Sequence, residues 1–119
     1  MSSEKNLYNL AKDQLNNAMK ICKLNENVKE ILQQPKNEII INFPVEMDNG
    51  QIKLFKSYRV QHNNILGPYK GGLRFSNHIY LDEIKSLAMW MTIKNSLQGL
   101  PYGGAKGGVR FNPNDYSKK

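Results

Sequence analysis

Residues 38–60 read EIIINFPVEMDNGQIKLFKSYRV, and this stretch decides the fold. Apolar residues alternate with mostly polar ones on both sides of its centre, which is the period of a half-buried strand. The centre contains Asn49-Gly50, a dipeptide that favours a two-residue turn in which both residues adopt positive φ. The sequence therefore predicts a β-hairpin with its apolar residues on one face. The predicted pairs are Ile39 with Val60, Ile41 with Tyr58, Val45 with Leu54 and Met47 with Ile52.

Pro44 interrupts the first strand of this hairpin. In the predicted register its nitrogen would have to donate a cross-strand hydrogen bond, which proline cannot do. We therefore expect a bulge or a break in the pairing at Pro44.

Helical periodicity precedes the hairpin. Over residues 4–24, apolar residues recur at steps of three and four, and Ser2 or Ser3 is suited to cap the first turn. The predicted inner face consists of Leu7, Leu10, Ala11, Leu15, Ala18, Met19 and Cys22. A shorter helix, which Pro35 ends, is expected to follow. Its predicted inward residues are Val28, Ile31 and Leu32.

A second long helix is predicted after the hairpin, over residues 80–98. Its apolar stripe consists of Ile84, Leu87, Ala88, Met91 and Asn95. Lys94 points with this stripe, and a buried lysine requires a partner or a role. The sequence thus predicts an α/β fold: an N-terminal helix, a mixed β-sheet with a hairpin, and this second long helix, followed by a glycine loop around Lys106.

Composition limits the class of protein. The chain has 119 residues, 39% of them hydrophobic, and a net charge of +7, which fits one globular domain and excludes a disordered chain. Its apolar runs are far shorter than the roughly 20 residues of a spanning helix, and its first residues lack the apolar core of a signal peptide. Cys22 is the single cysteine, and His62 and His78 have no metal-ligand spacing with it. We therefore expect a reduced, cytoplasmic protein with no metal and no membrane partner.

Three lysines stand in unusual contexts. Eight of the nine glycines lie within residues 67–108, and Lys70 and Lys106 each precede a glycine pair. A ligand can approach such a lysine closely, and a desolvated lysine can act as an acid or base. Together with Lys94, these two lysines would suit a small dianion.

The same residues also fit ordinary structural roles. Glycine pairs are mostly turns, and a lysine on an apolar helix face commonly extends to solvent. The phosphate-loop pattern fails, because Gly107 and not Ser or Thr follows Lys106. Residues 104–107 fit the G-x-x-G of a KH-type RNA-binding module, and the net charge of +7 leaves that alternative open.

Five segments carry a specific resemblance when they are taken together. They are Tyr58-Arg-Val-Gln-His-Asn63, Gly67-Pro-Tyr-Lys-Gly-Gly-Leu-Arg-Phe75, Leu81-Asp-Glu-Ile-Lys-Ser-Leu-Ala88, Met91-Thr-Ile-Lys94 and Leu100-Pro-Tyr-Gly-Gly-Ala-Lys-Gly-Gly108. In this order they resemble the N-terminal, substrate-binding domain of glutamate dehydrogenases, within the glutamate/leucine/phenylalanine/valine dehydrogenase family. The resemblance extends from about Ile39 to Arg110.

The resemblance implies a role for each lysine. Lys70 would bind the side-chain carboxylate of glutamate, with the backbone at Gly72 beside it. Lys94 would bind the α-carboxylate, and Met91 occupies a substrate-binding position that is glutamine in some members. Lys106 would be the catalytic proton donor. Members that use leucine or phenylalanine have an apolar residue in place of Lys70, so its charge favours a dicarboxylate substrate.

The resemblance also implies the reaction, the reversible oxidative deamination of L-glutamate to 2-oxoglutarate and ammonia with NAD or NADP. Residues 1–119 contain no G-x-G-x-x-G fingerprint, and the family's catalytic aspartate comes some tens of residues after Lys106. We therefore expect residues 1–119 to be an incomplete substrate-binding and oligomerisation domain that binds no cofactor tightly and is inactive alone. Family members are usually hexamers, so the expected partners are further copies or a separate cofactor-domain chain.

Two further functions are compatible with the sequence. A non-enzymatic assembly partner or inhibitor would dock on full-length subunits through the first helix and the hairpin edge. The RNA-binding module is the weaker alternative, because a G-x-x-G tetrapeptide is very common and no aromatic–basic signature accompanies it.

Overall fold

The computed structural model describes the backbone of residues 2–119 and the side chains from Leu7 onward. The expected caps Ser2 and Ser3 therefore lie outside the described side chains. The elements are α1 (Ser2–Cys22), α2 (Glu26–Leu32), β1 (Asn37–Glu46), β2 (Ile52–Asn63), β3 (Tyr69–Lys70), β4 (Leu73–Phe75), α3 (Leu81–Leu97), β5 (Gly103–Val109) and the 3₁₀ turn η1 (Pro113–Asp115). This arrangement confirms the predicted α/β fold with two long helices and a mixed sheet.

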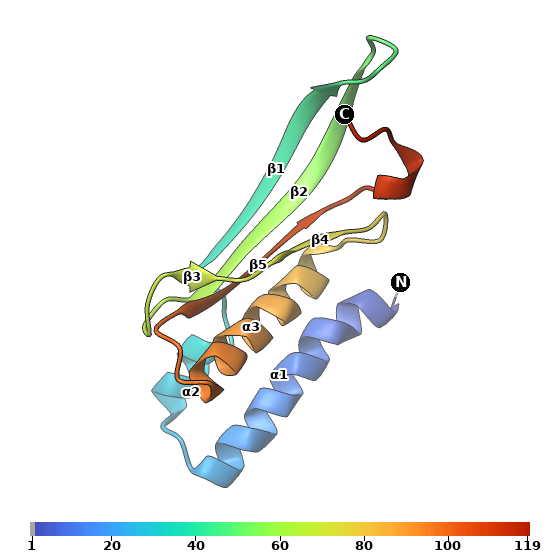
Figure 1. Ribbon diagram of the computed structural model, residues 1–119. Helices are drawn as coiled ribbons and strands as arrows, with labels where there is room; N and C mark the ends of the chain where they lie inside the picture. Colours follow the sequence, from blue (N-terminus) through green and yellow to red (C-terminus); the bar gives the residue numbers. More distant parts are fainter. Residues whose placement is uncertain (1) are drawn as a thin grey trace.

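Within residues 2–119 the sheet has five strands in the order β1-β2-β5-β3, and β4 also pairs with β5. The neighbours β1 and β2 are antiparallel, as are β2 and β5, whereas β3 and β4 run parallel to β5. Figure 1 shows the two long helices on one face of the sheet, with the β1–β2 hairpin extending well beyond them. The molecule is elongated as a result, with extents of 58 × 34 × 20 Å.

The hairpin turn differs from the predicted one. The Met47 amide donates to the Gln51 carbonyl at 2.8 Å, and the Gly50 amide donates to the Met47 carbonyl at 2.8 Å. Gly50 has φ +81°, and Asn49 is not among the residues with positive φ. The loop therefore has three residues, with glycine alone in the left-handed conformation. The predicted register is wrong by one residue: Val45 pairs with Lys53.

The corrected register explains how β1 accommodates Pro44. Pro44 lies opposite Leu54, and Met47 and Gln51 form a hydrogen-bonded pair three residues further on. Bonded and non-bonded pairs alternate in an antiparallel ladder, so Pro44 occupies a non-bonded position and its nitrogen faces the free edge of the sheet. The expected bulge or break is absent from the pairing of β1 with β2, and that prediction is wrong.

The register also decides which residues of β1 face the helices. Tyr58, Val60 and His62 are buried beneath α3. The one-residue shift places Ile39 and Ile41 on the opposite face of the sheet, where they are 40% and 46% exposed. The prediction that these two isoleucines share a face with Tyr58 and Val60 is therefore wrong.

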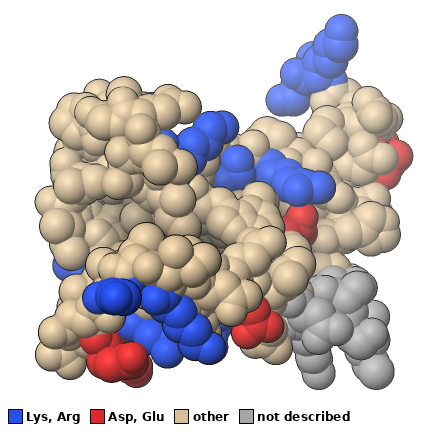
Figure 2. All heavy atoms as spheres, turned by 90° about the horizontal axis from the view of Figure 1, so that it is seen from below, with Lys and Arg blue, Asp and Glu red and all other residues tan. Residues whose placement is uncertain are grey.

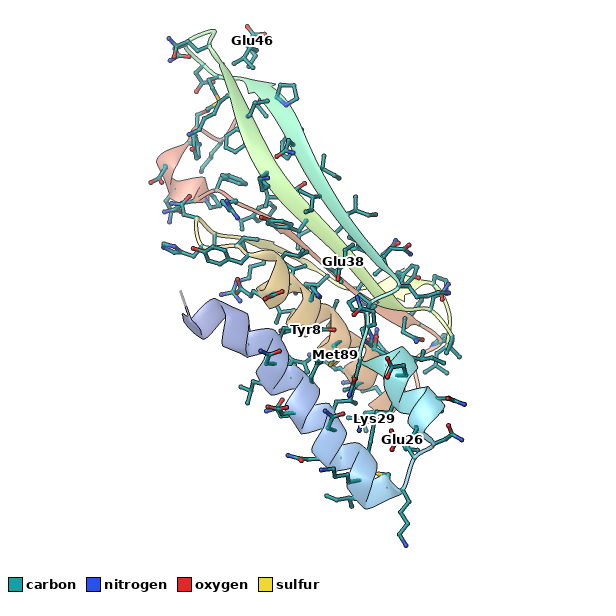
Figure 3. The ribbon with its side chains drawn as sticks, turned by 180° about the vertical axis from the view of Figure 1, so that it is seen from behind. Tyr8, Glu26, Lys29, Glu38, Glu46 and Met89 are labelled. Carbon is teal, nitrogen blue, oxygen red and sulfur yellow. The ribbon has the colours of Figure 1, made fainter. Side chains whose placement is uncertain are left out.

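α3 is buried on two sides. Ile84 and Ala88 pack on Tyr58, Val60 and Ile79 beneath the helix. Met89 packs with Tyr8 and Ala11 of α1, and Figure 3 shows the side chains of Tyr8 and Met89 between the two helices. The sequence prediction missed the buried residues Tyr8, Ser86 and Met89. The residues predicted to be inward but found exposed are Leu10, Ala18, Cys22, Val28 and Ile31.

The close contact of α3 with β5 depends on glycine. A Cβ atom at Gly104 would lie 2.0 Å from Thr92 Oγ1, and one at Gly108 would lie 2.7 Å from Ile84 Cδ1. At Gly104 the Cβ atom would also lie 2.2 Å from the Thr92 backbone nitrogen, so the helix can approach the strand this closely only because Gly104 has no side chain; at Gly108 the end of the Ile84 side chain would have to move. The glycine segment around Lys106 is therefore a strand of the sheet, and the predicted loop is wrong.

His62 connects three elements beneath the helices. Its Nε2 lies 2.8 Å from the carbonyl oxygen of Leu32, at the end of α2, and its Nδ1 lies 2.7 Å from Thr92 Oγ1 on α3. A neutral ring satisfies both contacts: Nε2–H donates to the carbonyl, and Nδ1 accepts from the hydroxyl. Burial lowers the pKa of His62, and the bond to the Leu32 carbonyl only partly opposes that shift.

We predict that Gly104→Ala lowers the free energy of unfolding by about 3 kcal/mol or more, because the new methyl group must displace Thr92 and its backbone. Gly72→Ala is the matched control. A Cβ atom there meets only Lys106 Nζ, at 3.5 Å, so stability should change by less than about 1 kcal/mol. Urea unfolding of the two variants measures the difference. Equal losses would contradict the proposed packing.

Acidification should destabilise the fold through His62. Because the pKa of His62 is lower in the folded state, the unfolded chain binds the proton first, and stability falls as the pH drops below about 6.5. The slope contributed by one such group reaches at most about 1.4 kcal/mol per pH unit. Thermal unfolding between pH 7.5 and 5.5 measures it. His62→Gln should lose this component, and exposed His78→Gln should keep it.

Candidate active site

Lys106 lies at the centre of β5 and is half-buried. Its register partner is Val60, which places it on the helix-facing side of the sheet. Its ammonium extends to the edge of the sheet, because a Cβ atom at Gly72 would lie 3.5 Å from Lys106 Nζ. The Gly107 amide also donates to the Gly72 carbonyl at 3.0 Å. Lys106 and Gly72 are therefore neighbours, as a shared site requires.

Lys70 reaches the same side of the sheet from β3. It pairs with Gly104 in a parallel register, two residues before Lys106 on β5. The chain then passes through Gly71, where a Cβ atom would lie 1.5 Å from the Ala105 carbonyl oxygen. Only glycine permits this approach, which separates β3 from β4 and leaves the backbone at Gly72 open. Lys70 itself is exposed.

Lys94 lies on the side of α3 that faces β3 and β4. Glu83 forms a salt bridge of 2.9 Å with Arg74 of β4, and Lys94 follows Glu83 by eleven residues, or about three helical turns. Lys85, on the other side of the helix, instead pairs with Glu38 of β1 at 3.1 Å. Lys94 is exposed, so of the two alternatives for a lysine on this stripe, burial and extension to solvent, the structure has the second.

The structure thus brings the predicted site residues to one edge of the molecule. Lys70 and Lys106 come from adjacent strands, Lys94 comes from the helix above them, and Gly72 lies at the gap between β3 and β4. Met91 is half-buried and precedes Lys94 by about one helical turn on the same side. Lysines on two adjacent strands and on the helix that covers them, with open backbone at Gly72, are suited to bind a small dicarboxylate through charge-assisted hydrogen bonds.

A separate cavity of about 580 Å³ lies near the far end of the hairpin. Its walls include Phe43, Phe55, Phe111 and Tyr116, which form an aromatic cluster between β1, β2 and the C-terminal segment. None of Lys70, Lys94 or Lys106 lines it. Cavity size alone therefore does not locate the lysine site.

The geometry removes the basis of the RNA-binding alternative. Residues 104–107 lie within β5, where Gly104, Ala105 and Gly107 are buried, whereas a KH-type G-x-x-G must project as a loop. On the face shown in Figure 2, Lys and Arg side chains form separate groups divided by neutral surface, and some lie beside acidic ones.

Two classes of site are absent from the described part of the chain. Among the described side chains, no group of three or more His, Cys, Asp or Glu is placed to hold a metal ion. No helix within residues 2–119 is long and apolar enough to cross a membrane.

Sequence reasoning missed the polar residues that hold this edge together. The sequence patterns leave His62 as an ordinary polar residue and place Asn95 in an apolar stripe. The Asn95 side chain is 3% exposed and donates to the Gly103 carbonyl at 2.8 Å. An asparagine on an otherwise apolar helical stripe was the available signal, because a buried amide requires hydrogen-bond partners.

Known proteins match this chain over most of its length. A family model described as Glu/Leu/Phe/Val dehydrogenase, dimerisation domain, matches residues 35–119. A glutamate dehydrogenase from Thermotoga maritima is 47% identical over 115 residues, which are 97% of this chain and 28% of that protein. An NAD-specific glutamate dehydrogenase from Clostridioides difficile is 43% identical over 113 residues, 95% of this chain and 27% of that protein.

A solved structure of a glutamate dehydrogenase also matches this chain. The crystal structure of a hetero-hexameric glutamate dehydrogenase from Thermus thermophilus, in a leucine-bound form, has a TM-score of 0.91 and 35% identity. The match covers 95% of this chain and 27% of that one. NADP-specific as well as NAD-specific enzymes are among the matched relatives.

This chain thus spans little more than a quarter of the length of the proteins it matches. The agreement covers the fold and most of the sequence of this chain. The chain belongs to the Glu/Leu/Phe/Val dehydrogenase family, whose dimerisation domain it matches over residues 35–119.

Proposed function

We propose that residues 1–119 are the substrate-binding N-terminal part of an NAD(P)-dependent glutamate dehydrogenase, which interconverts L-glutamate with 2-oxoglutarate and ammonia. Three observations support the proposal. Lys70 pairs with β5 two residues before Lys106, and Lys106 Nζ lies beside the open backbone of Gly72. Helical spacing from Glu83, which binds Arg74, puts Lys94 on the side of α3 that faces β4. A dicarboxylic substrate has two anionic ends, and this edge offers a separate ammonium group for each of them.

Each lysine has a distinct role in this proposal. Lys70 binds the side-chain carboxylate beside the open backbone at Gly72, and Lys94 binds the α-carboxylate, with Met91 against the carbon chain. Lys106 is less exposed than either, and its ammonium lies near Gly72. It is the catalytic proton donor: it protonates the oxygen that leaves the α-carbon when nitrogen is gained, and it takes a proton back in the reverse reaction. Restricted solvent access strengthens its interaction with charge that develops during the reaction.

Residues 1–119 do not suffice for turnover in this proposal. Hydride transfer requires a nicotinamide held against the substrate, and the resemblance assigns that task, and a catalytic aspartate, to chain beyond these residues. NAD or NADP is therefore expected in the complete enzyme, and purified residues 1–119 should reduce neither. Assembly into a hexamer would cover apolar residues such as Ile39 and Ile41 on the outer face of the sheet.

A joined enzyme provides the test. In it, residues 1–119 replace the matching N-terminal segment of the Thermotoga maritima relative, and the unmodified relative serves as the control for assembly and assay. Glutamate-dependent reduction of NAD or NADP by the joined enzyme supports the proposal. A joined enzyme that assembles like the control but does not turn over glutamate contradicts it.

In the joined enzyme, Lys70→Leu should lower kcat/KM for glutamate by about 10- to 150-fold, because one charge-assisted hydrogen bond is worth about 1.5–3 kcal/mol. Norvaline has no side-chain carboxylate, so its kcat/KM should fall little or rise. Lys53→Leu removes the same charge from the hairpin, where Lys53 contacts Tyr116, and should leave both substrates unaffected. Equal losses on glutamate and norvaline would remove Lys70 from substrate recognition.

Lys106→Ala should abolish most turnover of the joined enzyme while 2-oxoglutarate still binds, because Lys70 and Lys94 keep the two carboxylate contacts. A general acid or base contributes typically about 10²–10⁴-fold to the rate. Steady-state kcat and the dissociation constant of 2-oxoglutarate measure the two effects separately. Near-normal kcat in this variant would show that another group transfers the proton.

A further inference from the structure

Asn95 connects the end of α3 with the start of β5. It directly follows Lys94, and its buried side-chain amide donates to the Gly103 carbonyl at 2.8 Å. Its own carbonyl accepts from the Leu100 amide at 3.0 Å, in the turn that leads from the helix to the strand. Asn95 therefore fixes the last turn of α3, and with it Lys94, on the first residue of β5.

Gly103 carries this connection further. Its amide donates to the carbonyls of Gly67 and Pro68, at 3.1 and 2.9 Å. These residues immediately precede β3, on which Lys70 lies. One residue of β5, Gly103, thus connects the helix that carries Lys94 through its carbonyl with the segment that carries Lys70 through its amide.

The segment before Lys70 has little freedom to move. Gly67 has φ +147°, and a Cβ atom there would lie 2.0 Å from the Pro101 carbonyl oxygen. A Cβ atom at Gly103 would likewise lie 2.0 Å from the Asn63 carbonyl oxygen. Because the backbones meet without intervening side chains, a shift of Gly103 must be transmitted to its neighbours. The Asn95 amide is the side-chain contact that holds Gly103 from the helix side.

We propose that Asn95 is a positioning residue that sets the separation between the ammonium groups of Lys94 and Lys70, and thereby selects the length of the dicarboxylate. The inference rests on the proposed function, because it takes these two lysines as the carboxylate ligands. Asn95 itself is buried and touches no substrate. It acts through Gly103. Loss of the Asn95 side chain leaves both lysine charges present, but the distance between them is no longer fixed.

The test measures diacid length selectivity in the joined enzyme. Glutarate and adipate differ by one methylene, and each is used as a competitive inhibitor against glutamate. The ratio of the adipate to the glutarate inhibition constant reports the spacing of the two lysines. In Asn95→Ala this ratio should fall about fivefold, and KM for glutamate should rise about tenfold, as expected when a bound substrate is misplaced.

Two further variants separate positioning from folding. Asn95→Leu keeps nearly the size of the side chain but has no group that can donate to the Gly103 carbonyl, so the ratio should fall as in Asn95→Ala. Ser86→Ala removes another buried hydrogen bond of α3, from Ser86 Oγ to the Asp82 carbonyl at 2.8 Å. It should lower stability and leave the inhibition ratio unchanged.

The outcomes distinguish this inference from the function on which it rests. If the unmutated joined enzyme assembles but does not turn over glutamate, the proposed function fails. If it turns over glutamate, and the ratio is unchanged in either folded Asn95 variant, the positioning role alone is overturned. If neither Asn95 variant assembles while Ser86→Ala does, Asn95 serves folding only, and the positioning role is again overturned.

Discussion

The contact of α3 with β5 is the constraint on which the rest of the structure depends. Thr92 and Ile84 rest on Gly104 and Gly108 at distances that leave no room for a Cβ atom. This contact buries the centre of the helix and covers Val60 and Tyr58. A larger residue at Gly104 would meet the backbone of Thr92 and push the helix from the sheet, which would separate the two elements that carry Lys94 and Lys106.

The same absence of side chains builds the candidate site. Gly71 lets the chain cross close to the Ala105 carbonyl, so that β3 and β4 both pair with β5 and leave a gap beside Lys106. Polar side chains then fix the helix on this framework. His62 is hydrogen-bonded to the Thr92 hydroxyl, and the Asn95 amide donates to the Gly103 carbonyl. The site thus consists of lysines whose positions are set by glycine packing and buried hydrogen bonds in other parts of the chain.

The register of the hairpin could not be predicted from the alternation of apolar residues. Alternation of apolar residues correctly predicted two paired strands on either side of Gly50, yet the apolar residues of β1 and β2 do not share one face. A three-residue loop in place of a two-residue loop moves the register by one position, which exchanges the faces of β1 relative to β2. The difference lies in the conformation of Asn49, which alternation does not encode.

The sequence by itself determined the two long helices, the hairpin and the family, and it singled out Lys70, Lys94 and Lys106. Periodicity and local motifs can be recognised from the order of the residues, and these features depend on that order alone. Only the tertiary structure decided that the glycine segment is a strand, that Lys94 is exposed beside β3 and β4, and that Asn95 and His62 are buried. These outcomes depend on which backbone carbonyls and hydroxyls lie within hydrogen-bond distance after distant segments pack, and no local pattern specifies that.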